Sequence, residues 1–136
     1  MPPTATAGST PAPGTRAFFE HAEWLDYAEG SAALPILSAV RAKMAGKEEA
    51  PDDPRMKAQL ATNLDYVEGR LSGRPFLMGD APMLADIQMS YMLALLEMTG
   101  HLAGRPALAA YWDRIREQPS FRAAVARTGP VTPPAG

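Results

Sequence analysis

The strongest apolar pattern in the chain lies at residues 83–98, MLADIQMSYMLALLEM. Only Asp86, Gln88, Ser90 and Glu97 interrupt its apolar and aromatic residues, so no broad polar face is left for water. A helix that is apolar nearly all round is a buried one. With sixteen residues, two of them acidic, this helix is too short and too charged to span a membrane. The pattern therefore predicts the central helix of a bundle.

The start of this helix carries half of a capping motif. A capping box pairs Ser or Thr at the N-cap with an acceptor three residues later. Asp86 is that acceptor, but Met83 occupies the N-cap position. We expect Asp86 to accept from the Met83 amide, and the reciprocal bond to be missing. The spacing favours this structural helix-cap role for Asp86 over that of a general base.

A long helical pattern precedes the central helix, from Arg16 to about Ala45. Pro35 interrupts it, because proline has no amide to donate to the carbonyl of Ser31. We expect one long bent helix or two short helices in line. One predicted stripe recurs at helical spacing, with Trp24 and Tyr27 on an adjoining flank. The stripe comprises Phe18, Ala22, Leu25 and Ala28.

Three more helices complete the prediction. One begins near Asp53 and ends at about Leu71, and the other two begin at Pro106 and Pro119. No segment has a convincing strand pattern. The stripe of the first of these helices comprises Met56, Leu60, Leu64, Val67 and Leu71. The predicted fold class is all-α, a helical bundle of about five helices around a buried central helix.

Composition narrows the class of protein. With 136 residues, 46% hydrophobic and 21% charged, the chain is expected to form one globular domain at residues 16–129. The proline-rich residues 1–15 and 130–136 are expected to be a disordered lead-in and a flexible tail. A net charge of −2 gives no reason to expect nucleic acid or a membrane surface as partner. Without a secretory signal or a cysteine, a cytoplasmic protein is the default expectation.

The spacing of polar residues reveals no catalytic or metal-binding constellation. His21 and His101 lie on different elements without a ligand-spaced carboxylate, so we interpret them as surface or packing residues. The best functional candidates are Glu29, Gly30 and Ser31, because a distorted helix exposes backbone and can line a cleft. The competing interpretation of this segment is a simple structural bend.

Four segments in one order carry a family resemblance. The matching segments are WLDYAEGS at 24–31, LDYVEGRLSGRPFLMGD at 64–80, the apolar helix at 84–98 and YWDRIREQPSFRAAV at 111–125. Together they resemble the C-terminal helical domain of glutathione S-transferases, particularly bacterial ones, over about residues 16–127.

The family motif at the start of the central helix is also present in part. In that family a Gly-Asp pair, an aromatic residue, Ser or Thr and an Ala-Asp pair precede this helix. Gly79, Asp80, Ala85 and Asp86 match it, whereas Met83 replaces the Ser or Thr. The aromatic position is occupied by Pro82.

The resemblance implies a division of labour between two domains. Family members carry an N-terminal thioredoxin-like domain that supplies most glutathione contacts and the catalytic Ser, Tyr or Cys. Residues 10–16, TPAPGTR, resemble the linker between the domains, so we expect the thioredoxin-like half to be absent. By resemblance, Tyr27, Glu29, Ser31 and Leu34 border the electrophile pocket or the glutathione of a neighbouring subunit. No residue inherits a catalytic role, and no metal is implied.

Three functional hypotheses follow. The first is a helical domain that supplies the apolar substrate wall and dimer interface for glutathione conjugation with a thioredoxin-fold partner. In it glutathione is a co-substrate only when that partner is present. The partner of the chain is a second copy of itself, as a homodimer, or the thioredoxin-fold protein, and the ligand is an apolar small molecule. The second is a non-catalytic protein–protein interaction module, and the third is a truncated product. The surface left uncovered by the absent domain should be apolar.

Overall fold

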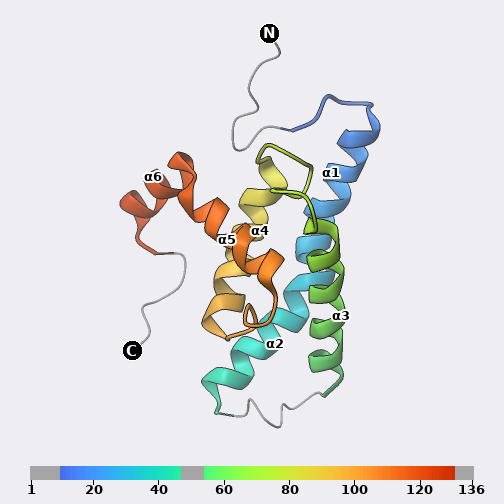
Figure 1. Cartoon of the computed structure of the whole chain (residues 1–136). Helices are drawn as coiled ribbons and strands as arrows, with labels where there is room; N and C mark the ends of the chain where they lie inside the picture. The colour runs from blue at the N-terminus through green and yellow to red at the C-terminus, as the bar shows by residue number, and fades with distance from the viewer. Residues whose placement is uncertain (1–9, 47–53, 131–136) are drawn as a thin grey trace.

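A computed structural model gives the fold of residues 10–46 and 54–130. The elements are α1 (Arg16–Tyr27), a π-helical turn η1 (Ala28–Ala32), α2 (Ala33–Met44), α3 (Pro54–Leu71), α4 (Leu84–Met98), α5 (Pro106–Glu117) and α6 (Pro119–Thr128). Figure 1 shows α4 and α5 in the middle of the bundle, with α3 on one side and α6 on the other. No strand occurs in the two described ranges, which contain only an isolated bridge between Phe76 and Gly79. The all-α class is confirmed, while most of the predicted lead-in and tail lies outside the described residues.

The first helical pattern forms one uninterrupted helix, in which η1 joins α1 to α2. Thr15 caps its start, because its hydroxyl accepts from the Phe18 amide at 3.1 Å. The distortion that the sequence predicts is the π-helical turn, which ends three residues before Pro35. Because Pro35 has no amide hydrogen, one backbone hydrogen bond is missing from the helix here. The wider π-helical turn adjusts the backbone to this missing bond.

The buried face of this helix differs from the predicted stripe. Phe18, Ala22 and Leu25 are only half-buried. The residues that enter the core from this helix are Trp24, Ala28, Ala32 and Ile36, with the polar His21 beside them. The prediction was wrong because it counted only apolar residues at regular spacing. The buried His21 and Trp24 place the true stripe one residue before Ala22 and Leu25 on the helix.

The stripe predicted for α3 is confirmed. Leu60, Leu64, Val67 and Leu71 are all at most 5% exposed, and Met56 is half-buried. Gly73 follows the helix with a φ of 76°, a value that favours glycine and reverses the chain. This helix therefore packs against both α2 and α5.

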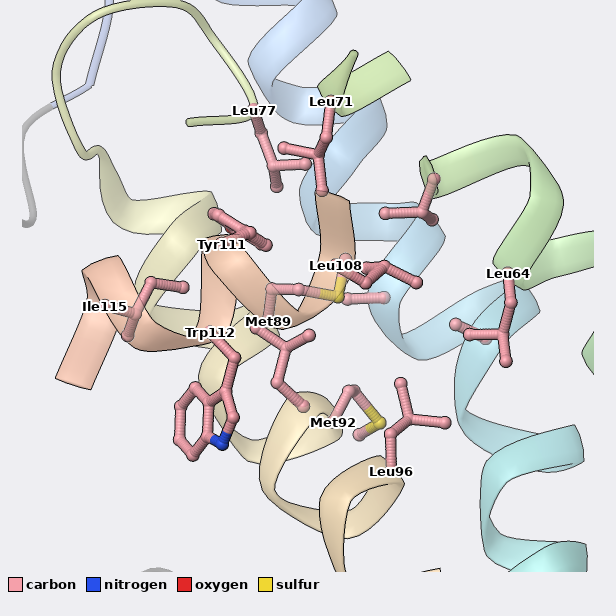
Figure 2. Packing of buried hydrophobic residues seen from close by; sticks show 14 of the residues in the cluster. Leu64, Leu71, Leu77, Met89, Met92, Leu96, Leu108, Tyr111, Trp112 and Ile115 are labelled. Carbon is pink, nitrogen blue, oxygen red and sulfur yellow. The ribbon is translucent and has the colours of Figure 1, made fainter. Parts of the chain in front are cut away.

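The central position of α4 is confirmed, although the helix is not buried all round. Nine of its residues are buried, and it contacts α1, η1, α2 and α5. Figure 2 shows Met89, Met92 and Leu96 of this helix grouped with apolar side chains of α3 and α5. One stripe faces solvent, and its three large apolar side chains are 39–47% exposed. These are Leu84, Ile87 and Tyr91.

The start of α4 is held by a buried polar network. Asp86 is 1% exposed and accepts hydrogen bonds from the Met83 amide at 2.7 Å, the Leu77 amide at 3.1 Å and the Tyr111 hydroxyl at 2.5 Å. The predicted bond from Met83 and the structural role of Asp86 are confirmed. For the reciprocal half, the Met83 side chain lies in capping-box position but makes no cap hydrogen bond, and the Asp86 amide donates to the carbonyl of Met83 at 3.0 Å. Its thioether sulfur is only a weak acceptor.

Side chains from other helices complete the first turns of α4 and α5. His21 of α1 accepts from the Ala85 amide through Nε2 at 3.0 Å. Glu68 of α3 accepts from the amides of Ala107 and Leu108 at 2.9 and 2.7 Å. These bonds satisfy amides that have no partner within their own helix.

The predicted helix α6 is the least buried element. It begins at Pro119 as expected, and none of its residues is fully buried. Its packing is confined to α5, where Phe121 lies edge-on to Trp112 with ring centroids 5.5 Å apart. Figure 1 shows α6 standing away from the rest of the bundle. A groove lined by residues of α4, α5 and α6 lies beside this helix.

Candidate functional site

The predicted site residues lie on and around the π-helical turn. Glu29 and Ser31 belong to η1 itself, Tyr27 is the residue before it, and Leu34 follows in α2. Single π-helical turns inside α-helices occur frequently at functional sites. The distortion that the sequence placed here is thus an independent reason to examine this segment.

Tyr27 is fixed against α3. Its hydroxyl donates to Asn63 Oδ1 at 2.5 Å, and Asn63 Nδ2 donates in turn to the Gln59 carbonyl at 2.8 Å. The Tyr27 ring lies 5.6 Å from that of Trp24 and 5.5 Å from that of Tyr66, centroid to centroid. Burial, with a smaller effect of nearby Tyr66, raises the pKa of Tyr27 to about 12. The phenol is therefore a neutral hydrogen-bond donor at physiological pH.

Ser31 and Leu34 line an open groove between the π-helical turn and α3, which we name the π-turn groove. Its lining residues are Gly30, Ser31, Leu34, Pro35, Ala58, Gln59, Thr62 and Asn63. The Asn63 amide is already paired, and the Thr62 hydroxyl donates to the Ala58 carbonyl at 3.1 Å. This leaves the exposed Ser31 hydroxyl and the Gln59 side chain as the polar groups that face a ligand.

Three of the four predicted residues are therefore brought together, and one stands apart. Tyr27 is joined to the groove through Asn63, whereas Ser31 and Leu34 line it directly. Glu29 is exposed and is not among the residues that line the groove.

A second groove, which we name the α6 groove, lies between α4 and α6 and has a volume of about 570 Å³. Binding pockets for small molecules measure about 300–1,000 Å³ and are mostly apolar. Its apolar lining comprises Pro82, Ile87, Ile115, Phe121, Ala124, Val125 and Pro130. Polar atoms at its floor and rim belong to Asp86, Ser90, Gln118, Ser120 and Thr128.

The sequence interpretation missed the α6 groove. Phe121 and Val125 are the large apolar residues of the last helix, and their spacing of four places them on one face. The run at 83–98 was expected to be buried nearly all round, which left no exposed side at Ile87. The signal that could have found the groove is the weakness of the last helix. Apart from these two positions its residues are mostly small or charged, so it cannot close tightly over α4.

Two buried titratable groups, His21 and Tyr111, belong to the fold and line neither candidate groove. Burial lowers the pKa of His21, and the negative charge of Asp86 offsets part of that shift. Burial raises the pKa of Tyr111 well above its usual range, and Asp86 adds to this shift through its charge and its hydrogen bond. His21 is the packing histidine that the sequence predicts. His101 is half-buried, with Nδ1 2.7 Å from the Thr99 hydroxyl.

Other kinds of site were sought in the described part of the chain. Within residues 10–46 and 54–130, no three His, Asp or Glu side chains are close enough to hold a metal ion. None of the helices described combines the length and apolarity needed to cross a bilayer.

Comparison with known proteins gives the class of this domain. The profile of the glutathione S-transferase C-terminal domain matches residues 50–114. Glutathione S-transferase 3 of Zea mays is 29% identical over 139 aligned positions, which cover 96% of this chain and 62% of the maize protein. The helical bundle is thus similar to the C-terminal domain of glutathione S-transferases.

Solved structures agree with this assignment. A glutathione transferase of Methylococcus capsulatus superposes with a TM-score of 0.69 at 29% identity, covering 90% of this chain and 59% of that one. BphK, a bacterial enzyme of this class solved as a ternary complex, gives a TM-score of 0.75 at 20% identity and shares the fold over 89% of this chain and 59% of its own. Through its helical domain the chain resembles the C-terminal domain of the glutathione S-transferase family. It spans about three fifths of the length of these relatives.

Proposed function

We propose that this domain supplies the apolar substrate wall of a glutathione transferase and acts with a thioredoxin-like domain or partner in the cytoplasm. The observation that carries the proposal is the α6 groove, because its volume and apolar lining suit a small apolar electrophile. The similarity to the C-terminal domain of glutathione S-transferases supports glutathione as the co-substrate.

The exposed stripe of α4 supports a partner on this side of the bundle. Leu84, Ile87 and Tyr91 expose 39%, 44% and 47% of their surfaces, and Ile87 also lines the α6 groove. A contiguous apolar surface of this kind is typical of an interface. A thioredoxin-like domain seated on the stripe would close the groove and exclude water from it.

In the proposed reaction the sulfur of glutathione is the nucleophile and attacks the electrophilic carbon, from which a halide or similar group leaves. The thiolate is the reactive form of a thiol, and the groups that favour it are assigned to the thioredoxin-like half. This chain contributes binding and orientation, which lower the barrier by holding the two reactants together. Tyr27, Glu29, Ser31 and Leu34 are assigned to the border of the ligand site, where the Ser31 hydroxyl is available for a polar contact.

The chain itself is proposed to form a homodimer through the aromatic side of α1 and α3. Tyr66 is 51% exposed although its ring packs against Trp24 and Tyr27. Sedimentation velocity is expected to show a dimer that Tyr66→Arg converts to a monomer. A wild-type chain that remains monomeric at high concentration would remove this part of the proposal.

To test the proposal, the chain is mixed with a purified thioredoxin-like domain of the family. The rate at which glutathione is conjugated to 1-chloro-2,4-dinitrobenzene is then measured by absorbance. The mixture is expected to react faster than the two components measured separately. Val125→Asp places a charge in the α6 groove and is expected to lower the rate about tenfold. Ala126→Asp is the matched control, because Ala126 is exposed on the same helix outside the groove.

Two outcomes would contradict the proposal. One is a mixture that reacts no faster than the thioredoxin-like domain alone. The other is an equal loss of rate in Val125→Asp and Ala126→Asp. Calorimetric titration of the chain alone with millimolar glutathione should give no saturable heat, since the thiol site is assigned to the other half. Saturable heat would place a glutathione site in this domain and would direct mutagenesis to Glu29 and Ser31.

The exposed stripe also favours a second function, that of a non-catalytic interaction module. Such a module would bind a protein partner through Leu84, Ile87 and Tyr91 without any need for the α6 groove. Tyr91→Lys would then abolish complex formation in gel filtration, while Val125→Asp would leave it intact. A clean monomer that binds no apolar dye would count against both functions.

A further inference from the structure

A third cavity lies at the end of the bundle where α4 finishes, and we name it the end pocket. It has a volume of about 170 Å³ and is lined by α2 from Pro35 onwards, the first turns of α3 and the residues just after α4. Figure 1 shows these three segments meeting at the bottom of the bundle, away from the start of α4. It shares only Pro35 with the π-turn groove and no residue with the α6 groove.

The interior of the end pocket is apolar and preformed. Pro35 and Leu60 are buried at its wall, and Met56 is half-buried beside them. Ala39 and Ala42 leave the space open because their side chains are too short to fill it. A dry apolar cavity of about 150 Å³ is large enough to hold a benzene ring. An aromatic ring or a short branched chain therefore matches this interior in size.

The rim of the end pocket is cationic. Lys43 at the end of α2 and Lys57 in the second turn of α3 both line it, and both side chains are exposed. Among the described residues neither ammonium takes part in an ion pair. No Asp or Glu of the described ranges lines the pocket. Within the described ranges, the rim thus combines two lysine side chains that form no ion pair with an apolar wall at Pro35, Ala39 and Leu60.

The end of α4 supplies a fixed polar edge. The Thr99 hydroxyl donates to the Leu95 carbonyl at 3.0 Å, so its oxygen accepts from Nδ1 of His101 at 2.7 Å. The two residues are held in place by the helix end, where the His101 amide donates to the Leu96 carbonyl at 2.9 Å and Gly100 has a φ of 78°. This edge is built by the fold and does not need a ligand to form.

We propose that the end pocket binds a small carboxylate with an apolar body. The ring or short chain lies among Pro35, Ala39 and Leu60, and the carboxylate pairs with Lys43 and Lys57. A carboxylate suits this rim because ion pairs with lysine are favoured where one side of the pair is shielded by apolar surface. The site is separate from the α6 groove, so it does not rest on the proposed transferase function.

The test is a titration of the full chain with sodium benzoate, followed by amide chemical shifts in ¹H–¹⁵N correlation spectra. Saturable shifts are expected at Ala39, Lys43 and Lys57. Benzamide has the same ring without the charge, and it is expected to bind at least fivefold more weakly. Raising the salt concentration to 0.5 M should weaken benzoate and leave benzamide unchanged, because only the former depends on charge.

Single variants separate the rim from the interior. Lys43→Gln and Lys57→Gln are each expected to weaken benzoate binding about threefold to tenfold. Arg41→Gln is the matched control, because it removes one exposed charge from α2 outside the pocket. Ala39→Leu fills the interior and should abolish the binding of both probes.

Ser38→Leu provides a second filled pocket if Ala39→Leu does not fold, and circular dichroism establishes folding for each variant. The proposal is overturned by benzoate shifts that rise linearly without saturating. It is equally overturned by equal losses in Lys43→Gln, Lys57→Gln and Arg41→Gln, or by saturable binding that survives in a folded variant with a filled pocket.

Discussion

The start of α4 and the π-helical turn of the first helix both place polar side chains beside the core, yet they hold them in opposite ways. At the start of α4, Asp86 and His21 are 1% and 2% exposed and are committed to partners within the fold. At the π-helical turn, Glu29 and Ser31 are exposed, and only Tyr27 is tied down. The difference indicates that the first region stabilises the domain and that the second leaves polar groups available for a ligand.

The strongest way to break this comparison is Asp86→Ala. The substitution removes one acceptor from three donors, the Leu77 and Met83 amides and the Tyr111 hydroxyl. Because buried donors would lose their partner, we expect a loss of about 4 kcal/mol in the free energy of unfolding. Urea denaturation measures it. Asp80→Ala, at an exposed position just before the helix, should change stability by less than about 0.5 kcal/mol.

The next largest effect concerns pH. Burial lowers the pKa of His21, so the folded state binds a proton less readily than the unfolded state does. Its contribution to stability is therefore complete above the ordinary histidine pKa of about 6.5 and falls as the pH drops below it. Denaturant midpoints measured from pH 8 to pH 5 should show this fall.

His21→Gln keeps an acceptor for the Ala85 amide and should flatten the fall in stability below pH 6.5. His101→Gln serves as the matched histidine control and should retain the fall. A pH profile unchanged in His21→Gln would show that this ring does not control the acid sensitivity of the fold.

Met83→Thr should stabilise the start of α4 further and so increase its difference from the π-helical turn. Met83 has the extended backbone of an N-cap residue, and a threonine hydroxyl accepts from the third amide of a helix far better than a thioether does. We expect a gain of about 1 kcal/mol, measured as a rise in the midpoint of thermal unfolding. No gain would mean that the bond from the Asp86 amide to the Met83 carbonyl, at 3.0 Å, already satisfies this amide.

The smallest effect on stability is expected at the π-helical turn. Ser31→Ala removes an exposed hydroxyl and should change the free energy of unfolding by less than about 0.5 kcal/mol. In the complex with a thioredoxin-like domain, the same variant should weaken glutathione binding in calorimetry. Ser72→Ala, in the exposed turn after α3, should affect neither quantity. Unchanged binding in Ser31→Ala would leave the π-helical turn as a structural bend.

The sequence predicted the features that depend on local patterns. The stripe of α3, the proline starts of α5 and α6, the central place of α4 and the bond from Met83 to Asp86 are all confirmed. Each of these depends on residues a few positions apart. Periodicity and capping rules therefore suffice to find them.

The features that escaped prediction depend on residues far apart in the chain. The predicted buried face of the first helix was wrong because His21 is buried through a hydrogen bond with the Ala85 amide, 64 residues later in the chain. The exposed stripe of α4 escaped because a uniformly apolar helix cannot show which of its sides lacks a neighbour. The α6 groove and the end pocket arise from the way separate helices diverge, which no pattern within one helix records.

The caps that His21 and Glu68 provide across helices also set the order in which the domain can fold. These bonds join residues 64 and 39–40 positions apart, so neither first turn is complete until distant helices have docked. The domain should therefore fold as one cooperative unit, and a fragment limited to α4–α6 should have frayed helix starts. Hydrogen exchange at the Ala85 and Leu108 amides would then require global unfolding of the domain, although each amide lies at a helix end.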